Sequence, residues 1–160
     1  MYRYRYLALL PLLLLLVCGC KDSSRPADLP PLYPCTVSVT QDGAPLEGAY
    51  VELVSQDAQK YRPSAAADAS GKATLLTYGF PGAPAGKYKI TVRKTIEDDI
   101  VYRIDEYGEQ SVASSNRYEL VDDRYHDAKQ TPHEIEITSK KVDITIDVGA
   151  AVRKKMAQSQ

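Results

Sequence analysis

Hydrophobic and polar residues alternate through most of the chain after residue 34. Cys35, Val37 and Val39 are separated by Thr36 and Ser38, and the same period of two recurs in four later stretches. This period places every second side chain on one face and is typical of a β-strand with one buried side. The four later stretches are residues 49–53, 88–92, 134–138 and 142–148. On this pattern we expect four isoleucine and valine side chains in the core: Ile90, Val92, Ile144 and Ile146.

Turn-forming residues separate these stretches. Asp42-Gly43 and the run 68–71, which ends in Gly71, suit tight turns, because glycine accepts positive φ and aspartate can bond its own backbone. Residues 72–77 predict a further strand, and residues 78–86 hold three glycines and two prolines, which predicts a loop. Short strands with so little helical periodicity indicate an all-β fold, an antiparallel sandwich or a small barrel.

The pattern breaks in residues 96–131, before the last two strands. Residues 96–103 could extend a strand, residues 105–116 are polar enough for an exposed excursion, and residues 120–128 could form one short helical turn. Long insertions on a sandwich are tolerated and often carry function. The tail, residues 149–160, is expected to be frayed.

The N-terminus has a different character. Arg3 and Arg5 precede an apolar run over residues 7–17, too short for a membrane-spanning helix but suited to a signal peptide. Val17 and Gly19 before Cys20 resemble the lipobox of bacterial lipoproteins. The resemblance implies that residues 1–19 are removed and that Cys20 carries the lipid, with two or more acyl chains giving stable anchoring. A short transmembrane anchor, or a plain signal with an incidental cysteine, remains as the alternative.

The lipoprotein interpretation sets the domain organisation. Residues 20–34 contain four prolines and predict a tether, residues 35–148 form the sandwich domain, and the lipid makes the membrane a partner. The domain is then periplasmic or extracellular. Lys21, rather than an aspartate, after Cys20 favours the outer membrane where the cell has one.

Net charge and cysteine content exclude one class of partner and one kind of covalent link. Without residues 1–19, which contain two of the 20 basic residues, the chain has three more acidic than basic groups, an argument against nucleic acid as a partner. Cys18 leaves with the signal and Cys20 is lipidated, so Cys35 has no partner for a disulfide within the chain. We expect Cys35 to be a small buried side chain, the alternative being a bridge to another molecule.

Three motifs resemble the carboxypeptidase regulatory-like domain over about residues 35–95. Residues 42–49 (Asp-Gly-Ala-Pro-Leu-Glu-Gly-Ala) and 68–72 (Asp-Ala-Ser-Gly-Lys) each precede a strand, and residues 84–92 (Pro-Ala-Gly-Lys-Tyr-Lys-Ile-Thr-Val) enter a third, on which Tyr88 should pack. More loosely, residues 125–127, 131–132 and the closing strands resemble the tail of small lipoproteins built on this module. The resemblance implies a transthyretin-like Greek-key sandwich of about seven strands. It also implies a binding or structural role, since the family is named for a non-catalytic domain.

Sandwiches of this class also include enzymes. Hydroxyisourate hydrolases need a C-terminal motif that this chain lacks. Intradiol dioxygenases hold iron with two tyrosines and two histidines, for which His126 and His133 with Tyr118 and Tyr125 are the candidates. Their irregular spacing across Pro132 favours two surface histidines instead. Asp98-Asp99 and Asp122-Asp123 could contribute to a calcium site, but they lack a regular ligand spacing and suit solvated turns better. We therefore predict no catalytic, metal or cofactor residue.

Four tyrosines, Tyr102, Tyr107, Tyr118 and Tyr125, fall in the insertion. Tyrosine suits recognition of protein or sugar, but such rings can also hold a long excursion on the sandwich, which is the interpretation we favour. The sequence thus predicts a non-enzymatic lipoprotein of the cell envelope, a binding or structural module whose partner is an envelope protein or a glycan. The alternatives are a carbohydrate-binding module, which needs exposed aromatic residues on a sheet face or loop tip, and a dioxygenase-like metalloenzyme.

Overall fold

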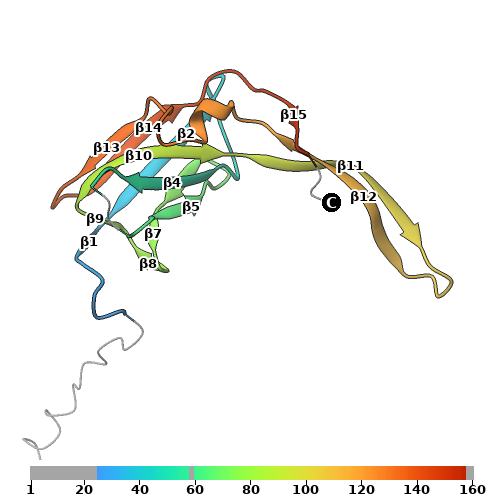
Figure 1. Cartoon of the computed structure of the whole chain (residues 1–160), viewed down its shortest axis with the longest axis horizontal. Coiled ribbons are helices and arrows are strands. Elements are labelled where there is room, and N and C mark those ends of the chain that lie inside the picture. The colour runs from blue at the N-terminus through green and yellow to red at the C-terminus, as the bar shows by residue number, and fades with distance from the viewer. Residues whose placement is uncertain (1–24, 58–59, 158–160) are drawn as a thin grey trace, which may run out of the picture.

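The computed structural model describes residues 25–57 and 60–157 (Figure 1). The predicted signal peptide, Cys20, the first part of the predicted tether and the last three residues lie outside this range. The described chain is built from β-strands with one short 3-10 turn, η2 (Asp123–Tyr125), so the all-β prediction is confirmed. Among the described residues no helix has the length and apolar character needed to cross a membrane.

Two sheets pack face to face as a β-sandwich. In the first, β2 (Cys35–Gln41) lies between β14 (Val142–Asp147) on one side and β3 (Ala44–Pro45) and β6 (Lys72–Thr74) on the other. The second sheet has the order β13-β10-β4-β5-β7-β8. Its strands are β13 (Glu134–Ile137), β10 (Gly86–Arg93), β4 (Tyr50–Ser55), β5 (Ser64–Ala66), β7 (Leu76–Thr77) and β8 (Phe80–Pro81).

The core lies between the inner faces of the two sheets. Strand β2 supplies the alternating Cys35, Val37 and Val39, all at most 1% exposed, and β4 and β10 supply matching residues from the opposite sheet. The predicted core residues Ile90 and Val92 are fully buried and Ile146 is buried. Ile144 is only half-buried, because β14 is an edge strand that the second sheet covers incompletely. Tyr88 is buried as expected, and its hydroxyl donates to the carbonyl of Pro84 at 3.0 Å.

One strand pair departs from a purely antiparallel sandwich. Strands β2 and β14 run parallel, with Val37 opposite Ile144 and Val39 opposite Ile146. The remaining pairs of strands among the described residues are antiparallel. The first sheet therefore joins its first strand in sequence to its last.

The predicted turns are present, and one predicted strand is divided. Asp42 and Gly43 have φ of 51° and 77° and join β2 to β3 as a two-residue hairpin turn. Gly71 has φ of 76°, and a Cβ there would lie 2.6 Å from the carbonyl oxygen of Val39. The stretch predicted as one strand, residues 72–77, instead changes sheets at the buried Leu75, with β6 pairing to β2 and β7 to β5.

The insertion forms a long hairpin, which we call the arm. Strand β11 (Thr95–Ile104) pairs with β12 (Gln110–Glu119), so the excursion expected over residues 105–116 is exposed for most of its length, and from residue 110 it is a regular strand. Lys94 alone separates β10 from β11, and Figure 1 shows β10 running on into the arm, which projects away from the sandwich. The helical turn expected in residues 120–128 is present as η2.

The two flanking segments are more ordered than the sequence suggests. In the described part of the tether, Leu29 is buried and β1 (Leu32–Tyr33) pairs with β9 (Ala83–Pro84), which itself lies in the predicted loop 78–86. Residues 25–34 therefore lie against the sandwich instead of forming a free spacer. Most of the tail is not frayed either, because β15 (Lys154–Lys155) pairs with β12 at the base of the arm.

Candidate functional site

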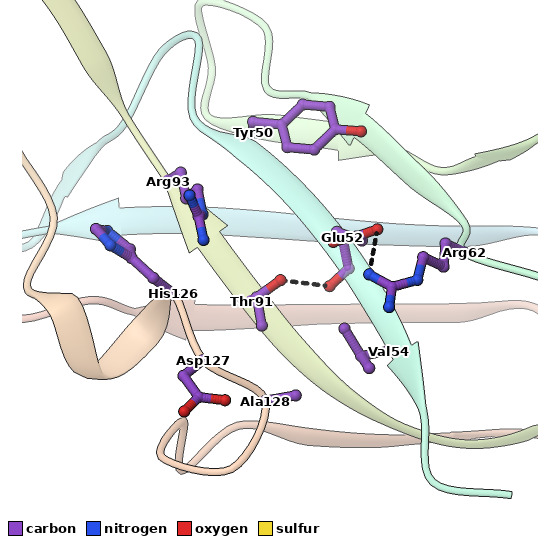
Figure 2. A pocket seen from close by; sticks show the side chains of 9 residues that line it. All are labelled: Tyr50, Glu52, Val54, Arg62, Thr91, Arg93, His126, Asp127 and Ala128. Carbon is purple, nitrogen blue, oxygen red and sulfur yellow. Dashed lines mark hydrogen bonds and ion pairs between the residues drawn. The ribbon is translucent and has the colours of Figure 1, made fainter. Parts of the chain in front are cut away.

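A groove of about 410 Å³ lies on the outer face of the second sheet (Figure 2). Its floor is a cross-strand ladder between β4 and β10, in which Tyr50 lies opposite Arg93 and Glu52 opposite Thr91. These residues face outward because the alternate positions, Val51, Leu53, Ile90 and Val92, fill the core. The volume falls within the range usual for small-ligand sites.

Two loops form the walls of the groove. On one side Arg62 donates to Glu52 at 3.3 Å, and on the other lie residues 126–128, which follow η2. The second wall is fixed to the sheet by the buried Thr131, whose hydroxyl donates to the carbonyl of Ile90 at 2.8 Å. Asp127 turns its carboxylate to its own loop, accepting the backbone N–H of Lys129 at 2.9 Å.

Arg93 is the unpaired charge of the groove. Figure 2 shows its guanidinium between Tyr50 and the 126–128 wall, without the contacts that join Glu52 to Arg62 and Thr91. No hydrogen bond or ion pair links the guanidinium of Arg93 to any described residue. Tyr50 opposite it is 47% exposed, so a flat apolar ring lies beside a free cation. A planar guanidinium with free donors binds carboxylates in a bidentate manner.

His126 connects the groove to the base of the arm. Its Nε2 is buried, accepts or donates no hydrogen bond among the described residues, and lies 3.5 Å from an oxygen of Glu119. Glu119 is 5% exposed, and its carboxylate accepts the backbone N–H of Lys94 at 2.8 Å and the hydroxyl of Thr95 at 3.2 Å. The β10–β11 joint, which supports the Arg93 end of the groove, is therefore held by a buried carboxylate.

The residues considered for a metalloenzyme are held by separate partners. The ring of His133 stacks on Tyr125 with ring centroids 5.5 Å apart, and its Nε2 lies 3.0 Å from the carbonyl oxygen of Asp147. The hydroxyl of Tyr118 donates to Asp99 at 2.7 Å at the base of the arm. Within residues 25–57 and 60–157, no three His, Cys, Asp or Glu side chains are grouped so as to hold a metal ion.

The two acidic pairs have structural partners. Asp98 accepts from Arg153 at 2.6 Å, and Asp99 accepts from Asn116 and Tyr118. These hydrogen bonds lower the pKa of both carboxyl groups. Asp122 caps η2, and Asp123 pairs with Lys154, which lowers the pKa of Asp123. The carboxylates weighed for calcium are thus engaged by the protein's own cations and donors.

The four tyrosines of the insertion differ in how far they are buried. Tyr125 is buried in the core and holds the insertion to the sandwich as expected. Tyr118 lies under the guanidinium of Arg153, 4.2 Å from it, and so holds the arm to the tail instead. Tyr102 and Tyr107 are 54% and 84% exposed on the arm, so that interpretation is wrong for them. Cys35 is 1% exposed, which removes its thiol from the reach of a second molecule.

The groove itself was not predicted, although part of its signal was present. Alternation placed Tyr50, Glu52 and Arg93 on the outer faces of their strands, but it could not show that β4 and β10 are neighbours. The register that sets Tyr50 against Arg93 is a tertiary property.

Comparison with known proteins leaves the family open. No family model matches the chain, and no curated protein matches it either. Among solved structures, a 9R-lipoxygenase from Cyanothece PCC8801 aligns with 79% of this chain at 16% identity and a TM-score of 0.34. The aligned chain spans only 18% of that lipoxygenase, and a likeness this slight carries no argument about fold or function.

Proposed function

We propose that this chain is a non-enzymatic lipoprotein of the cell envelope, anchored through Cys20, whose sandwich binds an acidic ligand in the groove. The anchor rests on the sequence, where Val17, Gly19 and Cys20 follow a basic and then apolar N-terminus. The transthyretin-like, carboxypeptidase regulatory-like assignment rests on the motifs at residues 42–49, 68–72 and 84–92. An all-β sandwich is consistent with that assignment.

The free guanidinium of Arg93 is the observation that carries the binding role. It lies in a groove whose other charges are mostly balanced within the fold, since Arg62 pairs with Glu52 and Asp127 bonds its own loop. A ligand that brings a carboxylate would supply the missing partner for Arg93. Charge-assisted hydrogen bonds of this kind are about twice as strong as neutral ones.

Tyr50 favours a sugar as the body of that ligand. An exposed aromatic ring on a sheet face is the feature that a carbohydrate-binding module needs, and Tyr50 is 47% exposed beside Arg93. The ligand class that fits both groups is an oligosaccharide bearing carboxylates. The dioxygenase alternative gains no such support, since the ring of His133 and the Tyr118 hydroxyl have separate partners.

Calorimetric titration of residues 21–160, which contain every strand of the described fold, tests the groove. An oligogalacturonate should bind, whereas a neutral glucan oligosaccharide of equal length should not. Arg93→Ala should weaken binding by about tenfold or more, because the charge-assisted hydrogen bonds between the guanidinium and the ligand carboxylate are lost. Arg103→Ala is the matched control, since Arg103 is an exposed arginine of the arm, outside the groove. Equal binding by Arg93→Ala, or no binding of the oligogalacturonate, would contradict the proposal.

Mass spectrometry of the membrane fraction tests the anchor. The wild-type protein should begin at Cys20 and carry the added mass of two or three acyl chains, and Cys20→Ala should abolish both changes. Retention of residues 1–19 on the wild-type protein, or an unmodified Cys20, would show that the lipobox interpretation is wrong. This outcome is independent of the titration.

A further inference from the structure

The outer half of the arm exposes a concentration of apolar side chains. Of the ten large hydrophobic residues that are exposed in the described chain, six lie between residues 100 and 112. Tyr107 is 84% exposed and Ile104 70% exposed, the two highest values among these ten. Scattered exposed apolar residues need no explanation, but a contiguous group marks an interaction site. The six are Ile100, Val101, Tyr102, Ile104, Tyr107 and Val112.

Three of these side chains lie together on one face of the hairpin, which the described part of the fold leaves exposed. Tyr102 lies directly opposite Val112 across the hairpin, and Ile104 is on the same side of β11 as Tyr102. The outer arm is two strands wide, because β12 pairs with β15 only at Tyr118 and Glu119. An isolated two-stranded hairpin is marginally stable in water, so this part of the arm gains from a third strand.

The base of the arm is held firmly. Arg153 binds Asp98 at 2.6 Å and lies over the ring of Tyr118, whose hydroxyl binds Asp99. Glu119 fixes the joint with β10 on the other side. A surface held in place before binding loses less conformational freedom when a partner docks. The arm thus presents its apolar surface in a set direction.

The charge of the outer arm indicates which kind of partner surface would complement it. From residue 100 to residue 116 the acidic groups are Asp105, Glu106 and Glu109, and Arg103 is the one basic residue. Asp105 closes the turn by accepting the backbone N–H groups of Tyr107 and Glu109, which leaves the two glutamates facing solvent. A complementary surface is basic and apolar. An anionic bilayer, or the arm of a second copy, would bring like charges together.

The backbone of the arm gives the mode of binding. Strand β11 lies at the edge of its sheet, with its outer hydrogen-bonding groups free of any described strand. We propose that the outer arm is a docking element to which an extended, basic and apolar polypeptide segment of a partner protein adds as a strand. Its backbone would pair with β11, while its lysines or arginines approach Glu106 and Glu109. This site is separate from the groove and goes beyond ligand binding by the sandwich.

A labelled ten-residue peptide of alternating lysine and valine is the probe, with fluorescence anisotropy of residues 21–160 as the readout. The wild-type protein should bind it, and a peptide of alternating glutamate and valine should not bind. Added salt should weaken the complex. Replacing Ile104, Tyr107 and Val112 together with serine should lower affinity about tenfold or more. Tyr78→Ser is the matched control, since Tyr78 is an exposed tyrosine on the sandwich.

A lysine–valine peptide methylated on alternate backbone nitrogens tests strand addition on the unaltered protein. It should bind at least about tenfold more weakly, because it lacks the donors that face β11. This comparison holds even where the triple variant does not fold. Absence of peptide binding, or equal binding of the methylated peptide, would overturn the proposal. It would equally be overturned if the wild-type protein, but not the triple variant, sedimented with phosphatidylglycerol vesicles or formed dimers.

Discussion

At the scale of single residues, the buried thiol of Cys35 has a measurable consequence. Burial raises the pKa of Cys35 to about 11, and the carboxylate of Asp143 adds to the effect. The thiolate is the reactive form of cysteine, so Cys35 should be inert near neutral pH. In residues 21–160, where it is the sole cysteine, a thiol reagent at pH 8 should modify it about a hundredfold more slowly in the native state than in urea. Rapid labelling of the native protein would contradict its burial.

The same burial makes the stability of the protein sensitive to alkaline pH. In the unfolded chain Cys35 titrates near its ordinary value of 9.0, whereas in the folded protein it keeps its proton up to about 11. Above pH 9 the unfolded state therefore binds fewer protons, and the free energy of unfolding falls as pH rises. Tyr88, whose pKa burial raises to about 12, adds a similar loss at higher pH. Urea denaturation at pH 8 and pH 10 is the measurement. Between these pH values the free energy of unfolding should fall less in Cys35→Ala than in the wild-type protein.

At the scale of elements, the joint between β10 and β11 depends on one side chain. Glu119→Ala leaves the part-buried backbone N–H of Lys94 without its acceptor, which should lower the free energy of unfolding by about 1–3 kcal/mol. Glu119→Gln keeps an acceptor oxygen for this N–H and should lower the free energy of unfolding by less. Glu97→Ala, which removes an exposed ion pair with Arg117, is the control and should cost about 1 kcal/mol or less. Equal urea midpoints for the two alanine variants would show that the joint is not held in this way.

Comparison of two elements shows how far the sequence predicts this fold. Strand β10 was predictable because one of its faces is buried, so that Tyr88, Ile90 and Val92 alternate with polar residues. Strand β12 was not, because it owes its conformation to pairing with β11 and its outer half has no buried face to impose alternation. The charges of the tail were visible in the sequence, but not that Arg153 meets Asp98 at the base of the arm.

The candidate site, like the fold, could be predicted from the sequence only in part. Alternation predicts which residues of β4 and β10 face outward. The groove also depends on the register between the two strands and on the wall that follows η2, and alternation predicts neither. Leu29 is a further example, since it lies between Asp28 and Pro30 in a segment without periodic alternation, yet it is buried. Periodicity therefore predicts strands with a buried face and misses contacts between segments distant in sequence.

At the scale of the whole molecule, the sandwich depends on its last long strand. Removal of residues 142–160 would free the edge of β2 that β14 covers, next to the core residues Val37 and Val39. An open edge beside an incomplete core promotes aggregation, so this truncated chain should not give a cooperative thermal transition. Removal of residues 150–160 alone is the control. It removes Arg153 and β15 but keeps both sheets, and should leave a monomer that unfolds cooperatively, as size-exclusion chromatography and circular dichroism would show.

The continuity of β10 with β11 also determines how the molecule would bear a mechanical load. A pull on the outer arm passes along a single stretch of backbone into β10, which is paired on both sides, with β13 and with β4. Hydrogen bonds in antiparallel pairs run perpendicular to the strands, so tension along β10 loads them in shear and together, not one after another. A force applied at the arm is thus resisted by an interior strand of the larger sheet, held by neighbours on both of its edges.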